Sequence, residues 1–166
     1  LQDLAQSLKA NSPRVLLFVG GTPELVRFTQ GIEKQAAQRY IVAMSDVNLQ
    51  SIQQMGMSRF TSMIATQVVP MVNANLPMVK AYRAALGRLY DEPPTPLSLA
   101  GYVAARYTHE VLQRVDGPLN RSTAMLAFMR RTAMDIGGFR IAPDNRARGT
   151  AYVTQSMISA DGRLVG

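Results

Sequence analysis

Residues 15–32, VLLFVGGTPELVRFTQGI, predict a strand, a turn and a helix in succession. The first five residues are apolar without alternation, which is typical of a parallel strand that is covered on both faces. Gly20 and Gly21 end the run, and a helix is predicted to follow. Thr22 is expected to be the N-cap of this helix, and Pro23 is expected at its first position, where a fixed φ is favourable. The buried stripe of the helix is predicted at Leu25, Phe28, Ile32 and Ala36.

A second predicted strand, Tyr40–Met44, follows and ends at Ser45 and Asp46. Strand, helix and strand in this order predict a βαβ crossover, because parallel strands need a connection of about this length. A short helix around Val47–Gln54 and a third extended segment, Thr61–Val69, come next. An amphipathic helix marked by Leu1, Leu4 and Leu8 precedes the first strand. Together these segments predict half of an open α/β sheet.

The pattern becomes helical from Asn73 to Ala133. A short strand, Phe139–Ile141, and a last alternating strand, Ala151–Ser159, which turns at Asp161–Gly162, are predicted after it. The three predicted helices therefore have no sheet of their own to cover. Either a small mixed sheet forms from distant strands, or elements that belong upstream are missing. The helices are marked by Met78, Tyr82, Ala85 and Leu89; by Leu99, Tyr102, Val103, Arg106, Val111 and Leu112; and by Met125, Phe128 and Met129.

Composition excludes several classes of function. The chain has 166 residues, no cysteine and a formal charge of +7. The absence of cysteine excludes disulfides, thiolate metal sites and thiol nucleophiles. The basic residues are spread along the chain rather than clustered with aromatic residues, so we expect no nucleic-acid partner. No basic start with a following apolar stretch is present, so no leader peptide is predicted in this chain.

Polar residues follow the first two predicted strands. In open α/β sheets, small molecules bind beyond the carboxyl ends of the strands. Gly21 and Thr22 follow the first strand, and the free N–H groups of the next helix could bind a polar or anionic group there. Ser45 and Asp46 follow the second strand. Two simpler interpretations stay open: the glycines form only a tight turn, and Asp46 only caps the short helix at Val47.

Catalytic and metal chemistry find little support. His109 is the only histidine, and no partner residues stand at metal-ligand spacing, so we expect a surface residue and no metal site. No nucleophile elbow is present, and no catalytic residue or cofactor is predicted. An α/β enzyme that uses Gly20, Gly21 and Thr22 as a phosphate cradle is the weakest of the functional hypotheses.

Several motifs, in colinear order, resemble one family. They are residues 15–32, the TQVVP that ends the third strand, LSLAGYVAARYTHEVL, Arg121, and the ending DIGGFRIAPDNRARGTAYVTQSMISADGR. The family is the substrate-binding proteins of branched-chain-amino-acid-type ABC importers, the type I periplasmic binding proteins. In this family two α/β lobes are joined by crossing segments and hold the ligand between them.

The resemblance implies an α/β fold made of portions of two doubly wound lobes joined by crossing segments. Residues 1–69 would be part of the second, C-terminal lobe, and residues 70–142 part of the first lobe. Residues 143–166 would be the return crossing and the final strand of the second lobe. The chain would then be the C-terminal half of a receptor, a fragment whose other half accounts for the helices without a sheet.

The resemblance also implies a function. The chain would belong to a periplasmic protein that delivers an amino acid or a related small carboxylate to the permease of an ABC importer. In relatives that bind amino acids, the loop after the second strand gives an acidic residue to the ligand ammonium. Here Ser45 stands at that position and Asp46 one residue on, so a carboxylate without an amino group is a real alternative. A ligand-sensing domain of a receptor or regulator is the alternative function, and a homodimer of the fragment is a possible assembly.

Overall fold

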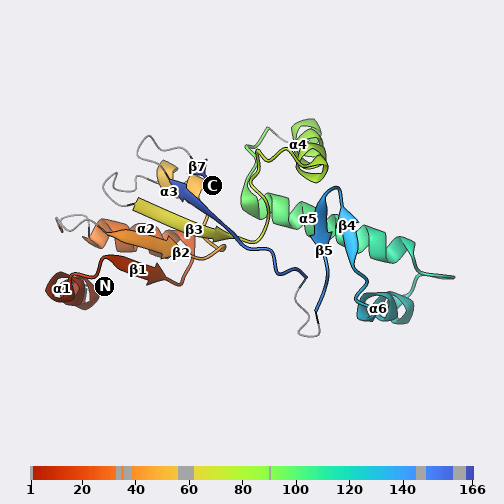
Figure 1. Cartoon of the computed structure of the whole chain (residues 1–166), viewed down its shortest axis with the longest axis horizontal. Helices are drawn as coiled ribbons and strands as arrows, with labels where there is room; N and C mark the ends of the chain where they lie inside the picture. The colour runs from red at the N-terminus through yellow and green to blue at the C-terminus, as the bar shows by residue number, and fades with distance from the viewer. Residues whose placement is uncertain are drawn as a thin grey trace. The chain divides into compact units, whose positions relative to one another are not determined.

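The computed structural model describes residues 2–32, 35, 39–55, 62–89, 91–144, 149–158 and 164–166. The chain divides into two compact units (Figure 1). The first unit consists of Leu1–Val68 and Val153–Gly166, and the second consists of Val69–Tyr152. Each unit has a hydrophobic core of its own.

A five-stranded sheet forms the centre of the first unit, in the order β1-β2-β3-β6-β7. The strands β1, β2 and β3 are parallel, whereas β6 runs antiparallel to β3 and β7 antiparallel to β6. The predicted βαβ crossover and opening helix are confirmed. The strand β7 is not predicted from the sequence, while Thr61, Ser159 and the predicted turn at Asp161–Gly162 lie outside the described residues. The elements of this unit are α1 (Gln2–Asn11), β1 (Val15–Phe18), α2 (Thr22–Ile32), β2 (Tyr40–Ala43), α3 (Leu49–Gln54), β3 (Ser62–Gln67), β6 (Thr154–Ile158) and β7 (Leu164–Val165).

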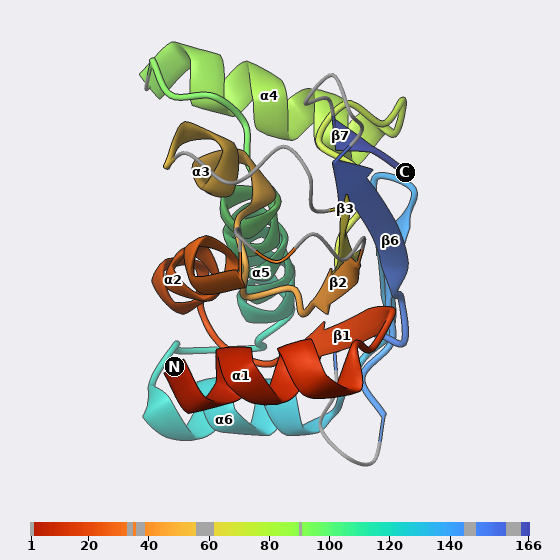
Figure 2. The same cartoon turned by 90° about the vertical axis from the view of Figure 1, so that its left-hand side faces the viewer.

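One face of this sheet carries the core. The helices α2 and α3 lie on the same side of the strands (Figure 2), and the apolar stripe of α2 packs against alternate residues of the strands. Leu25 and Ile41 have no exposed surface, and Leu16 and Phe18 of β1 are partly buried against the same cluster. Ala36, the last residue of the predicted stripe, lies outside the described residues.

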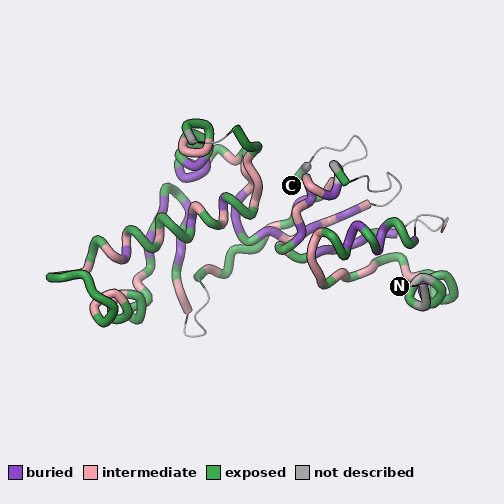
Figure 3. Tube along the Cα trace, turned by 180° about the vertical axis from the view of Figure 1, so that it is seen from behind, coloured by how far each residue is buried: buried purple, intermediate pink, exposed green. Residues whose placement is uncertain are grey.

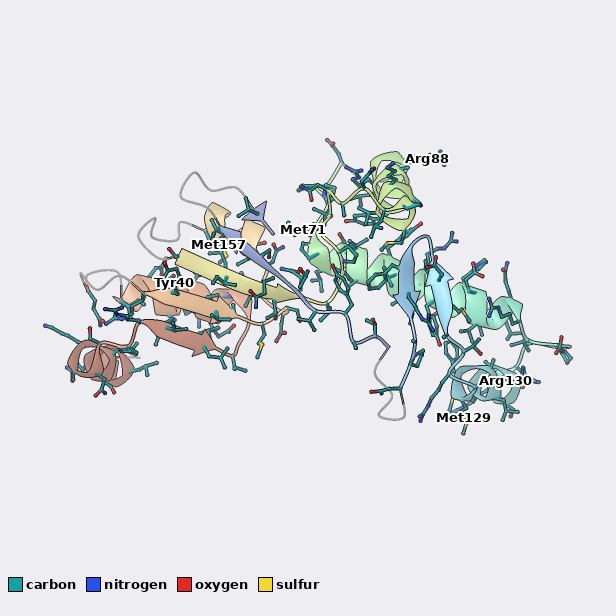
Figure 4. The ribbon with its side chains drawn as sticks, viewed as in Figure 1. Tyr40, Met71, Arg88, Met129, Arg130 and Met157 are labelled. Carbon is teal, nitrogen blue, oxygen red and sulfur yellow. The ribbon has the colours of Figure 1, made fainter. Side chains whose placement is uncertain are left out.

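The opposite face of β1 is exposed, which contradicts a sequence prediction. The apolar run predicts a strand that is covered on both faces, but Leu17 is 65% exposed and Val15 is 59% exposed. The helices of the described chain pack on one face only, so the second face of β1 stays open. Tyr40 and Met157, labelled in Figure 4, are likewise exposed. The strand register joins one residue from each strand into a single apolar row on this face: Leu17, Val42, Ile64, Met157 and Val165.

The second unit consists of three helices and a β-hairpin. The helices are α4 (Pro77–Leu89), α5 (Pro96–Gln113) and α6 (Arg121–Met129), as the helical pattern predicts, and the strands are β4 (Met134–Ile136) and β5 (Phe139–Ile141). The hairpin turns at Gly137 and Gly138, which both have positive φ, and Asp135 accepts a hydrogen bond from the Gly138 amide. The sequence predicts β5 but not β4. The described sheet of this unit is thus a local hairpin, not a mixed sheet of distant strands.

The helix α6 is the exposed element of the second unit. None of its residues is buried, although the spacing of Met125, Phe128 and Met129 predicts an apolar stripe. Met129, labelled in Figure 4, is 70% exposed, and Met125 is 56% exposed. The tube of α6 carries only the colours of exposed and intermediate residues (Figure 3). Phe128 contacts the Tyr107 ring, with 6.4 Å between the ring centroids. The stripe therefore exists in the sequence, but most of it has no cover in the described chain.

Candidate ligand-binding loops

The loops after β1 and β2 lie at the same edge of the sheet. Phe18, the last residue of β1, pairs in register with Ala43, the last residue of β2. The two strands are parallel, so their following loops leave the sheet together. The backbone N–H of Asn48 donates a hydrogen bond of 3.0 Å to the Thr22 hydroxyl and so connects the second loop to the start of α2. The structure therefore brings the two predicted polar loops together.

Thr22 does not cap its helix, which corrects the sequence prediction. The first helical hydrogen bond of α2 runs from the Leu25 N–H to the Gly21 carbonyl, at 3.1 Å, so Gly21 occupies the cap position. Thr22 is the first helical residue, and its hydroxyl accepts from Asn48 instead of from its own helix. A hydroxyl has one hydrogen to donate and two lone pairs, so Thr22 can still donate to a ligand.

The structure of the loop after β2 contradicts the simpler interpretation, in which Asp46 caps the short helix. The Asn48 side chain accepts from the Ser51 N–H at 3.3 Å and caps α3, which begins at Leu49 rather than Val47. Asp46 is therefore not the cap of this helix. Its side chain is exposed, and Ser45 beside it is half-buried. Both residues stay available at the surface of the loop.

Gly21 lies close to a carboxylate. A Cβ atom built on Gly21 would come within 2.9 Å of Glu24 Oε2, which lies in the first turn of α2. An acidic group near the N-terminus of a helix is favourable because it complements the positive end of the helix dipole. The Glu24 carboxylate thus lies beside Gly21 at the N-terminus of α2.

Asn48 is the residue that sequence analysis missed. Its position three residues before Ser51, directly ahead of the segment LQSIQQ, is a helix N-cap signal that the sequence does contain. Its backbone contact with Thr22 has no sequence signal, because the two residues are 26 positions apart.

The residues that the structure describes contain neither a metal-binding cluster nor a membrane-spanning helix. No group of three or more histidine, cysteine, aspartate or glutamate residues in this part of the chain could hold a metal ion. His109 is exposed on α5, as predicted. No helix in the described ranges has the length and the apolar character needed to cross a membrane.

Comparison with known proteins identifies the fold. The family model described as periplasmic binding protein matches residues 1–163. Among curated proteins, none matches the chain. An extracellular ligand-binding receptor from Verminephrobacter eiseniae is similar with a TM-score of 0.85 and 22% identity, over 99% of this chain and 48% of that chain.

Two further solved structures give the same result. A leucine-binding protein from Thermotoga maritima has a TM-score of 0.82 at 15% identity, over 98% of this chain and 46% of that chain. An ABC transporter solute-binding protein from R. palustris in complex with benzoate has a TM-score of 0.77 at 10% identity, over 99% of this chain and 45% of that chain. This chain thus spans less than half the length of each of these proteins. With the family match over nearly all of its residues, the chain belongs to the periplasmic binding protein family and has the type I α/β fold of the substrate-binding proteins of branched-chain-amino-acid ABC importers.

Proposed function

We propose that this chain forms part of a periplasmic solute-binding protein that delivers an amino acid or a small organic acid to the permease of an ABC importer. The proposal has the family match over residues 1–163 in its favour. Within this proposal, residues 1–69 belong to the second lobe of the receptor, residues 70–142 to the first lobe, and residues 143–166 to the return crossing and the final strand of the second lobe. The division of the chain into two compact units supports this assignment.

The observation that carries the proposal is the hydrogen bond from Asn48 to Thr22. It connects the loop after β2 to the N-terminus of α2, which supports a shared polar surface made of Gly21, Thr22, Ser45 and Asp46. The Thr22 hydroxyl and the N–H groups at the start of α2 would bind a carboxylate of the solute. Asp46 would bind a positive group when the solute carries one.

The mechanism follows from differential affinity. A solute that touches both lobes only in a closed state stabilises that state, and the permease recognises the closed form. This chain supplies the polar loops of one lobe, so it makes only part of the contacts. We expect the isolated chain to bind its solute weakly, and a micromolar affinity measured by calorimetry would contradict this expectation.

Two features of the polar loops bear on the chemistry of the solute, and they favour different ligands. The position of Ser45 argues against a tight ammonium site, whereas the carboxylates of Glu24 and Asp46 favour one. Solved structures with the same fold include one described as leucine-binding and one in complex with benzoate. Leucine and benzoate therefore represent the two ligand classes to be compared.

A titration followed by nuclear magnetic resonance tests the proposal at weak affinity. Leucine, isoleucine and benzoate are added separately to the ¹⁵N-labelled chain. We expect saturable shifts of the Gly21, Thr22, Ser45 and Asp46 amides with one of these solutes. The amide of Gly117, in the second unit, is the control and should not move.

The outcomes separate the candidate functions. The variant Thr22→Val should abolish the shifts at all four loop residues, while Thr22→Ser should keep them because it retains the hydroxyl. Shifts caused by a nucleotide at Gly20 and Gly21, with none from the three solutes, would favour the phosphate-cradle enzyme and contradict this proposal.

A further inference from the structure

Glu24 holds an acidic group beside the first polar loop. A Cβ atom built on Gly21 would lie 2.9 Å from Glu24 Oε2, so the carboxylate occupies the space that a side chain on Gly21 would need. Gly21 is not among the glycines with positive φ, so its backbone conformation does not require glycine. What the missing side chain permits is the close approach of the carboxylate.

The Glu24 carboxylate is exposed and has no partner. Within the residues that the structure describes, no hydrogen bond or ion pair joins this side chain to another group. The positive end of the α2 dipole stabilises the negative charge in the first turn of the helix. Both carboxylate oxygens therefore stay free to accept hydrogen bonds from a ligand.

Donors for a carboxylate lie beside this acceptor. The first N–H groups of a helix have no partner within it, and in α2 these belong to Thr22 and Glu24, because Pro23 has no N–H. The Thr22 hydroxyl accepts from the Asn48 N–H and still has its own hydrogen to donate. The start of α2 thus combines donors for an anion with an acceptor for a cation.

An α-amino acid carries the complementary pair of charges. Its ammonium and carboxylate groups are attached to one carbon atom, so the protein groups that bind them must lie close together. Glu24 meets this condition, since its carboxylate lies beside Gly21 and directly before the first turn of α2. Asp46 is exposed in the other loop, and in the described ranges no hydrogen bond or ion pair joins it to α2.

We propose that Glu24 binds the ammonium group of the solute and makes the site selective for an α-amino acid over a plain carboxylate. The inference rests on the proposed function. Glu24 takes the role that amino-acid-binding relatives give to an acid in the loop after β2, where this chain has Ser45. A plain carboxylate at the start of α2 would meet the negative charge of Glu24 without a compensating ammonium group, and like charges repel.

Matched pairs of ligands isolate the contribution of the ammonium group. Isocaproate is leucine without its amino group, and hydrocinnamate is phenylalanine without it. Each of the four is titrated into the ¹⁵N-labelled chain, and its dissociation constant is taken from the shifts of the Thr22 and Ser45 amides. We expect at least one amino acid to bind about tenfold more tightly than the matching carboxylate, because the carboxylate lacks the charged hydrogen bond to Glu24.

Glu24→Gln keeps the size of the side chain and removes its charge. It should weaken the binding of that amino acid about tenfold and strengthen the binding of the matching carboxylate. Glu24→Asp retains the charge and should retain most of the preference. Gly21→Ala displaces the carboxylate without changing any charge, so it should also reduce the preference. Glu92→Gln removes an exposed acid of the second unit and is the matched control, which should leave both dissociation constants unchanged.

An unchanged preference in Glu24→Gln, with the Ile41 and Met63 amides at their native positions, would overturn the inference. A loss of the preference in Asp46→Asn, and not in Glu24→Gln, would assign the ammonium to Asp46 instead. Carboxylates that bind more tightly than their amino acids would also overturn the inference, while the proposed function would stand. No response to any of the four solutes would reject the proposed function, and the inference with it.

Discussion

The backbone N–H of Asn48 donates to the hydroxyl of Thr22 at 3.0 Å, across 26 positions of the chain. Both ends of this bond lie at the carboxyl end of the parallel sheet. The same Asn48 caps α3 through its side chain, so one residue fixes the start of α3 and the start of α2. The geometry of the polar loops therefore depends on a contact with Thr22, and not on the two glycines alone.

Thr22→Val should destabilise the first unit. The change keeps the side-chain volume but removes the acceptor of the Asn48 N–H, and an unsatisfied, partly buried donor costs about 1–3 kcal/mol. Thr22→Ser is the matched control and should cost less, because the hydroxyl remains. Native-state hydrogen exchange of the Ile41 and Ala43 amides measures the free energy of opening of this unit alone. Equal stability of both variants would contradict a structural role for the bond.

Gly137→Ala should destabilise the second unit. A Cβ atom there would lie 2.8 Å from the Met78 backbone N, which donates a hydrogen bond to the Gly137 carbonyl. The φ of +59° at Gly137 adds strain for any other residue. Backbone strain of this kind costs about 1–3 kcal/mol. Hydrogen exchange of the Ile136 and Ile141 amides should report the loss.

Gly101→Ala is the counterpart of that substitution and should increase the stability of the second unit. Gly101 lies within α5 and is exposed, and no atom lies within 4 Å of the added Cβ. Alanine in place of glycine inside a helix stabilises by about 0.5–1 kcal/mol. A thermal denaturation curve of each glycine variant tests the pair. A loss of stability at Gly101 would show that α5 has a neighbour at this position that the structure does not contain.

Tyr82 and Thr95 should act together at the N-terminus of α5. Thr95 is the N-cap and accepts from the Ser98 N–H at 3.1 Å, while its own N–H donates to the Tyr82 hydroxyl at 3.2 Å. Tyr82→Phe should cost about 0.5–1.5 kcal/mol, and Thr95→Ala about 0.5–2 kcal/mol. Urea unfolding of both single variants and the double variant measures the coupling. The costs should not add, because both residues share Ser98 as a partner.

Ser156→Ala should destabilise the pairing of β3 with β6. The Gln67 side-chain amide donates to the Ser156 hydroxyl at 3.2 Å, and both side chains are buried. Removal of the acceptor leaves a buried donor unsatisfied at a cost of about 1–3 kcal/mol. Gln155→Ala, at an exposed position of the same strand, should change stability by less than about 0.5 kcal/mol. Hydrogen exchange of the Ala65 amide distinguishes the two, and equal effects would contradict the prediction.

The local structure of this protein can be predicted from its sequence alone. The five apolar residues from Val15, the two glycines after them and the helical period from Leu25 predict strand, turn and helix in the right order, because backbone preference and average burial are local properties. The colinear motifs added the family and its fold. The capping motif around Asn48 is also readable in the sequence.

Which surfaces meet is a property of the tertiary fold and has no signal in the sequence. The fold placed β6 antiparallel to β3, with Ser156 against Gln67 across 89 positions, and it brought the Asn48 N–H to Thr22. It also left Leu17 exposed, although the sequence of β1 predicts cover on both faces. A residue pattern records how apolar a face is, whereas the cover of that face depends on which distant segment packs against it.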